Sequence, residues 1–172
     1  EKEIETTIVE DDASFSVTTA PWYFSVDKHS GLELAINTSR FRVERFGETL
    51  NMTEAAIVAI ALDFIDATQV ADTSETVVDR IMYTRNIVGS FAGDMYIETV
   101  TEADVVFVRY LNGIPVIGPG SKLVVTVGSD GTVTGYYKLW RTIEGPMERA
   151  CVTIDVESSF DKLLEETQRD RD

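Results

Sequence analysis

The sequence has few of the side chains that most often carry out chemistry in proteins. Its 172 residues include one cysteine, Cys151, and one histidine, His29. A single cysteine excludes a disulfide within the chain, and these two residues cannot complete a four-ligand zinc site without carboxylates. Cys151 lies in a short apolar segment and His29 in a polar turn, so we interpret them as a small core residue and a solvated side chain. We therefore expect no cofactor, no metal ligand and no catalytic residue.

Positively charged residues are also scarce. Lys and Arg together number 15 and Asp and Glu number 30, which gives a formal net charge of −15 at pH 7. Contacts to nucleic-acid phosphates and to anionic membrane surfaces both depend on clustered Lys and Arg. The composition therefore argues against both kinds of partner.

Long apolar runs are missing as well. The longest, Ala55 to Leu62, is ended by Asp63 and falls short of the roughly 20 residues that span a bilayer. The chain begins with Glu1 and shows no signal-peptide pattern. We interpret it as a processed piece of a secreted or membrane-tethered protein, or as a shortened cytosolic one. It would reach a membrane only through an anchor absent from this chain.

What the sequence does contain is typical of a globular protein. Hydrophobic residues make up 44% and charged residues 26%. Changes in pattern along the chain divide it into an acidic lead-in at 1–12, a β region at 13–48, a helix followed by a sheet at 49–145, and a C-terminal helix region at 146–172. We expect these parts to form one compact unit.

Alternation of apolar and polar residues predicts many strands. Asn112-Gly113 and Asp130-Gly131 are typical of tight hairpin turns, so consecutive strands are expected to pair as an antiparallel meander. The predicted strands are 14–18, 32–36, 41–46, 77–88, 95–100, 105–111, 114–117, 122–127 and 132–143.

Two helices are predicted. The first covers 54–69, is rich in alanine and begins near Asn51 or Thr53, which are both helix-capping residue types. Its apolar stripe is broad, so we expect a sheet to cover it. The second, at 156–168, has a narrower stripe. The predicted fold is α+β: an antiparallel meander packed against the Ala-rich helix, with an N-terminal β extension and a C-terminal amphipathic helix.

One stretch is distinctive. An aromatic residue, a glycine and Ile114-Pro115-Val116 are followed by Gly118, a strand, Asp130-Gly131 and Val133. This order resembles PepSY and thermolysin-type propeptide domains, and the helix ahead of the strands agrees with their order. It is also similar to extracytoplasmic domains of membrane-tethered regulators of a Gram-positive histidine kinase. The resemblance implies a cystatin-like, helix-on-sheet fold and a location outside the cytoplasm.

The resemblance implies a non-enzymatic domain that regulates or inhibits a partner protein. The partner would dock on the sheet surface that the helix leaves open, or add a strand at the edge that Pro115 creates. Aromatic residues and the proline on these strands are the candidate contacts: Tyr110, Pro115, Tyr136, Tyr137 and Trp140.

Two other functions stay open. A sensor domain could hold a small ligand between helix and sheet, or gather calcium with its surplus of carboxylates. An enzyme could use a carboxylate pair, such as Glu98 with Asp104 or Asp63 with Asp66. Since no pattern distinguishes these carboxylates from ordinary surface charge, we interpret them as solvated.

Overall fold

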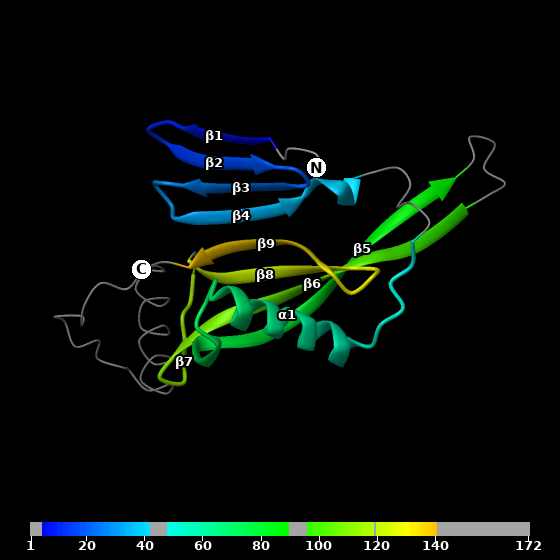
Figure 1. Ribbon diagram of the computed structural model, residues 1–172. Helices are drawn as coiled ribbons and strands as arrows, with labels where there is room; N and C mark the ends of the chain where they lie inside the picture. The colour runs from blue at the N-terminus through cyan, green and yellow to red at the C-terminus, as the bar shows by residue number, and fades with distance from the viewer. Residues whose placement is uncertain (1–4, 42–47, 90–95, 119, 141–172) are drawn as a thin grey trace, which may run out of the picture. The chain divides into compact units, whose positions relative to one another are not determined.

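The computed structural model describes residues 5–41, 48–89, 96–118 and 120–140. These residues are mostly antiparallel β-sheet with one α-helix, α1, at Glu54–Thr68 (Figure 1). Two 3-10 helices, η1 at Thr38–Phe41 and η3 at Thr73–Glu75, lie between the larger elements. The strands are β1 (Thr6–Glu10), β2 (Ser14–Thr19), β3 (Trp22–Asp27), β4 (Leu32–Asn37), β5 (Thr76–Gly89), β6 (Tyr96–Leu111), β7 (Ile114–Pro115), β8 (Ser121–Gly128) and β9 (Val133–Trp140).

The strands form one sheet in the order β1-β2-β3-β4-β9-β8-β6-β5, and β7 pairs with β6 beside this path. Every neighbouring pair is antiparallel. The predicted antiparallel sheet is therefore confirmed. Because β9 pairs with β4, the four N-terminal strands continue the sheet that the later strands build.

Helix α1 packs across β6, β8 and β9. Its N-cap is Thr53, whose side chain accepts a hydrogen bond from the Ala56 N–H at 3.3 Å, so Thr53 and not Asn51 caps the helix. The helix buries residues four apart, as a face turned to a sheet requires. The core between helix and sheet consists of Ile57, Ala61, Ile65, Ala103, Val105, Phe107, Leu123, Val125 and Val127.

The structure differs from the prediction at several strands. Strand β1 lies within the segment expected to be a lead-in; all five of its residues are exposed, so its sequence carries no core pattern. Strand β3 was not predicted. The predicted strands 95–100 and 105–111 belong to one continuous strand, β6. The prediction divided it at the stretch that contains Glu102 and Asp104, which lie inside the strand. Phe41, expected in a strand, belongs to η1, and 42–47 lie outside the described residues.

Both predicted hairpin turns have the expected backbone. Asn112 and Gly113 have φ angles of 51° and 80°, and Gly131 has 79°. Glycine adopts such angles without strain, and asparagine tolerates them better than most residues, which explains the residues at these positions. The predicted helix 156–168 and Cys151 lie outside the described residues. In the part of the chain that is described, no helix combines the length and apolarity needed to cross a membrane.

Candidate functional site

An aromatic cavity of about 550 Å³ lies between the C-terminal end of α1 and strands β3, β4 and β9. We call it the aromatic groove. This volume falls within the range of small-ligand pockets. The groove is lined by Trp22, Phe24, Glu33, Ala35, Phe64, Thr68, Gln69, Val70, Tyr136 and Lys138.

Strand register explains why these aromatic side chains meet. Phe24 pairs with Ala35, and Ala35 pairs with Tyr136, so the three side chains lie in one row on the same face. Trp22, two residues before Phe24, stacks on it with ring centres 5.9 Å apart. Phe64 of α1 packs on Tyr136, with ring centres 5.8 Å apart. The helix and the sheet therefore both supply aromatic walls.

An ion pair crosses the floor of the groove. Lys138 Nζ donates to Glu33 Oε1 at 2.8 Å, and the two side chains are 17% and 32% exposed. Burial is the main cause that raises the pKa of Tyr136, and the negative charge of Glu33 raises this pKa further. Among the described residues, no group bonds to the Tyr136 hydroxyl or to the second carboxylate oxygen of Glu33. Both oxygens are therefore available to a ligand.

The end of α1 adds a further negative feature. Its last turn contains Asp66 and no basic residue, although the carbonyl end of a helix carries about half a negative charge. Gln69, in the left-handed conformation with φ of 55°, caps the helix, and its side chain donates to the Asp66 carbonyl. Thr68, Gln69 and Val70 then form one rim of the groove.

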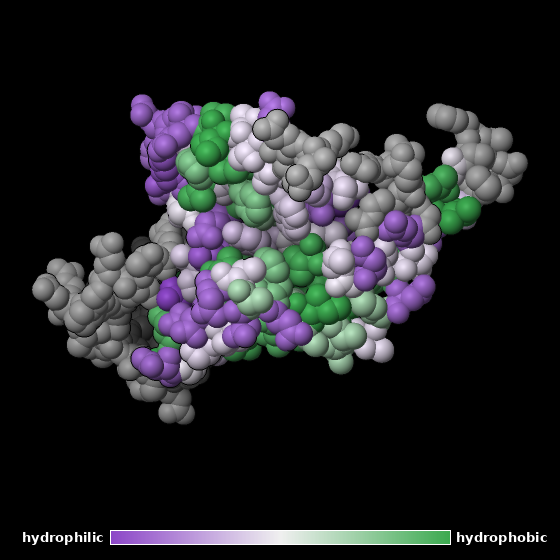
Figure 2. Space-filling model, in the orientation of Figure 1, coloured by the Kyte–Doolittle hydropathy of each residue, from purple (hydrophilic) through white to green (hydrophobic). Residues whose placement is uncertain are grey.

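On the α1 side of the sheet, an apolar surface extends from the groove toward β1. Ile8 pairs with Val17, and Val17 with Phe24, so the aromatic row continues across these strands. Ile8, Phe24 and Val26 are 63%, 37% and 36% exposed. In Figure 2, hydrophobic atoms gather over these N-terminal strands and again around α1. We call Ile8, Val17, Phe24 and Val26 the β1–β3 face.

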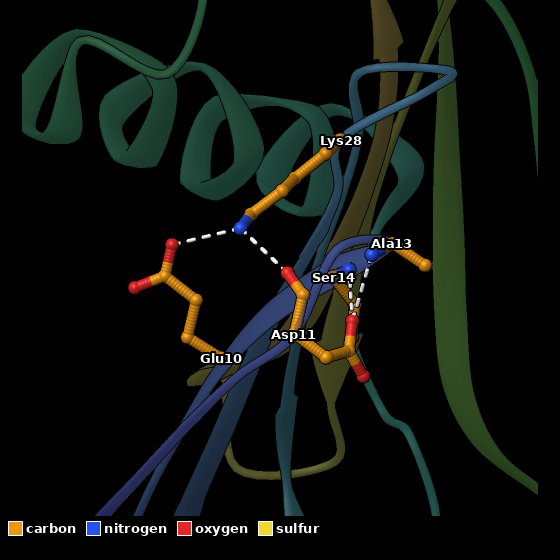
Figure 3. A network of polar contacts seen from close by, with 5 residues as sticks. All are labelled: Glu10, Asp11, Ala13, Ser14 and Lys28. Carbon is orange, nitrogen blue, oxygen red and sulfur yellow. Dashed lines mark hydrogen bonds and ion pairs between the residues drawn. The ribbon is translucent and has the colours of Figure 1, made fainter.

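One ion pair and two turn aspartates lie beside the β1–β3 face. Lys28 Nζ donates to Glu10 Oε1 and to the Asp11 carbonyl, each at 2.7 Å (Figure 3). The Asp11 carboxylate accepts from the Ser14 and Ala13 N–H groups at 2.6 and 2.8 Å, and these bonds lower the pKa of Asp11. Glu10 therefore has a cation beside it, on a chain whose net charge is −15.

The structure does not bring the five predicted contact residues together. Tyr136 lines the groove, and Trp140 lies on the same side of the sheet, with the Arg109 guanidinium 5.4 Å from its ring centre. Tyr137, 39% exposed, points to the opposite side. Tyr110 pairs with Pro115 at β7, where Pro115 borders a separate hollow of 620 Å³.

The carboxylates considered for catalysis are scattered. Asp63 and Asp66 are exposed on α1. Glu98 pairs with Arg85, which lowers the pKa of Glu98, whereas Asp104 accepts a hydrogen bond from Thr126 at 2.6 Å. In residues 5–41, 48–89, 96–118 and 120–140, no group of three or more His, Cys, Asp and Glu side chains could hold a metal ion.

Most residues of the groove were not found from the sequence. Trp22-Tyr23-Phe24-Ser25-Val26 is an aromatic and alternating run, and this pattern was the signal that could have revealed β3. Lys138 and Glu33 are 105 residues apart, so only the fold shows that they pair. Comparison of the chain with protein-family models, curated proteins and solved structures finds no match.

Proposed function

We propose that this chain is a non-enzymatic protein-interaction domain that regulates or inhibits a partner protein outside the cytoplasm. The observation that carries the proposal is the β1–β3 face, which presents exposed Ile8, Phe24 and Val26 beside the aromatic groove. Contiguous exposed apolar surface of this kind marks interaction sites on proteins. The partner docks on this face.

The pairing of nearby charges supports docking there. Two of the carboxylates around the face have a Lys partner, since Glu10 pairs with Lys28 and Glu33 pairs with Lys138. An apolar centre with a polar, satisfied rim is the usual anatomy of an interface. These two pairs reduce the negative charge that a partner would meet beside this face.

The sequence resemblance supports the regulatory role and the location. PepSY and thermolysin-type propeptide domains place a helix ahead of an antiparallel meander, and α1 with β5 to β9 has that order. The PepSY-like or cystatin-like assignment remains part of the proposal, since a fold alone does not determine a function. The non-enzymatic role is supported by the placement of Asp63 and Asp66 on the exposed surface of α1.

Site-specific photo-crosslinking tests the proposal. Benzoylphenylalanine is placed at Val26, and in a matched control at Tyr137 on the opposite side of the sheet, in protein produced in its native cells. We expect one partner protein to be captured from position 26 and not from 137. Equal capture from both positions, or none from 26, contradicts the proposed docking face.

A second function is favoured by the aromatic groove itself. A cavity of about 550 Å³ with aromatic walls could hold a small ligand, and the domain would then act as a sensor of that ligand. The calcium form of the sensor rests only on the chain's surplus of carboxylates. Melting curves with calcium and with EGTA test the calcium form. A melting temperature that rises with calcium and falls again with EGTA would favour the calcium sensor, whereas unchanged curves count against calcium binding.

A further inference from the structure

The aromatic groove has the chemistry of a site for an organic cation. We propose that the aromatic groove receives an arginine or lysine side chain of the partner protein, an inference that rests on the proposed function. The partner segment is basic, with apolar residues on either side of the inserted side chain. Three independent features of the groove lead to this conclusion: its rings, its oxygens without a hydrogen bond among the described residues, and the end of α1, whose last turn has no basic residue.

The rings come first. Trp22, Phe24, Phe64 and Tyr136 line one cavity, and Trp22 and Phe24 are already stacked. Aromatic faces carry a negative quadrupole, so they attract a guanidinium or ammonium group placed over them. The aliphatic stem of Arg or Lys is also apolar, and it gains by lying along the same walls.

The acceptors are the second feature. Glu33 uses only Oε1 to bind Lys138, so Oε2 is available within the described residues. Tyr136, whose hydroxyl also has no hydrogen bond there, lines the same cavity. Lys138 does not exclude an added cation, because one carboxylate can accept from two donors. The two free oxygens give an entering cation its hydrogen bonds.

The end of α1 is the third feature. Helix C-termini favour Lys, Arg or His in the last turn, yet α1 has none there and carries Asp66 instead. The groove lies against this end, through Thr68 and Gln69. A cation from the partner therefore adds positive charge beside a last turn that contains no basic residue. The chain's net charge of −15 also attracts a basic segment at long range.

Small probes test the charge preference without the partner. The full chain, labelled with ¹⁵N, is titrated with n-butylguanidinium, with neutral n-pentanol and with anionic pentanoate, and amide and indole shifts are followed by NMR. We expect butylguanidinium to shift the Trp22 indole, Gln69 and Val70, and the other two probes to shift them less. Equal shifts from all three probes, or none in the groove with butylguanidinium, overturn the proposal.

Two variants test the residues. Glu33→Gln should weaken butylguanidinium binding about threefold, the change expected when a partly exposed charge contact is lost. Its matched control is Glu10→Gln, which removes another Lys-paired carboxylate outside the groove. Thr68→Lys supplies a cation at the exposed end of α1 and should compete with the probe while raising the melting temperature. Unchanged probe binding in both variants, with native spectra, overturns the proposal.

A blocked Leu-Arg-Leu peptide identifies the source of the cation. Its flanking leucines can reach exposed Phe24 and Val26, so it should bind more tightly than butylguanidinium. Tighter binding of the free cation than of the peptide would indicate a small-molecule ligand and overturn the partner assignment. If position 26 captures a partner while the groove ignores cations, this inference fails and the proposed function stands. If no partner is captured at all, the proposed function itself fails.

Discussion

Arg40 forms an ion pair with Glu102, although 62 residues separate them in the sequence. Arg40 lies in η1, just after β4, and Glu102 lies on β6, three strands further along the sheet. Glu102 is 8% exposed and also accepts a hydrogen bond from Thr134 at 3.0 Å. This buried charge therefore ties the N-terminal strands to the strands beneath α1.

Removing the cation of this pair should destabilise the protein strongly. Arg40→Met leaves the Glu102 carboxylate buried without its charge partner, and such changes cost about 3 kcal/mol. Arg40→Met with Glu102→Gln should recover much of that loss, since a neutral amide can still accept from Thr134. Urea denaturation of the single and double variants measures both effects. If the double variant loses as much stability as Arg40→Met and Glu102→Gln lose together, the two side chains have no net coupling.

Acid should loosen the N-terminal turns. Hydrogen bonds from the Ser14 and Ala13 N–H groups lower the pKa of Asp11, and bonds from Ser30 lower the pKa of Asp27, in each case from the ordinary 3.8. A lowered folded-state pKa means that the ionised form is the stabilising one. The stabilisation is therefore complete above pH 3.8 and is lost as the pH falls through the lower, folded-state value.

Melting curves of Asp11→Asn between neutral and acid pH check this pH dependence. The variant should melt below the wild type at pH 7, and the difference should shrink as the pH falls below 3.8. Asp12→Asn is the control, since the described residues give Asp12 no hydrogen bond. A difference between Asp11→Asn and wild type that stays constant with pH would contradict the assigned role of the Asp11 carboxylate.

The end of β5 at Gly89 and the start of β6 at Tyr96, which pair with each other, should exchange amide hydrogens faster than the rest of β6. The last β6–β8 pair is Glu102 with Gly128, and beyond it β6 pairs with β5 among the described strands, with one added bond from Leu50 N–H to the Val100 carbonyl. Two-stranded ribbons are marginally stable in water. Exchange at Ile97, 50% exposed, should exceed that at fully buried Phe107 by orders of magnitude. Equal protection would mean that the ribbon has further support.

The helix and the strands that it covers could be predicted because their buried residues recur at helical or strand spacing in the sequence. Ile57, Ala61 and Ile65 are spaced for a helix face, and the alternating valines of β8 are buried as their pattern indicates. The turn at Asn112-Gly113 was equally readable, because few residues other than glycine tolerate its backbone angles. In these segments each local preference agrees with the fold.

The N-terminal strands and the charged part of β6 were harder to predict, because their sequences show no regular pattern of buried residues. Strand β1 is exposed throughout and has no periodic core residues, so only its pairing with β2 defines it. Two acidic residues, Glu102 and Asp104, interrupt the apolar pattern of β6 and therefore suggested a break in the strand. The strand tolerates them because Arg40 and Thr126, from distant segments of the chain, bind their carboxylates. The groove depends on the pairing of β4 with β9, a contact across about 100 residues that no local pattern encodes.

Gly135 is the position at which this pairing is most sensitive. A Cβ added there would lie 2.6 Å from the Ala35 carbonyl oxygen, a backbone atom of β4 that cannot rotate away. It would also approach the Arg40 guanidinium at 3.6 Å. Gly135→Ala should therefore push β4 from β9 and destabilise the protein by about 1–3 kcal/mol, the usual cost of overpacking. Because β9 joins β4 to the rest of the sheet, the loss should concentrate in β1 to β4.

Hydrogen exchange of Gly135→Ala measures where the stability is lost, with Gly131→Ala as the matched control. Gly131 has φ of 79°, so its substitution also strains the backbone, but an added Cβ there meets only Met52 and Ile60 at 3.5 and 3.6 Å. We expect Gly135→Ala to raise exchange in β2 and β3 far more than in α1, and Gly131→Ala to show no such bias. Uniform loss of protection in both variants would mean that β1 to β4 unfold only together with the helix-covered strands, and the β4–β9 boundary would then have no separate stability.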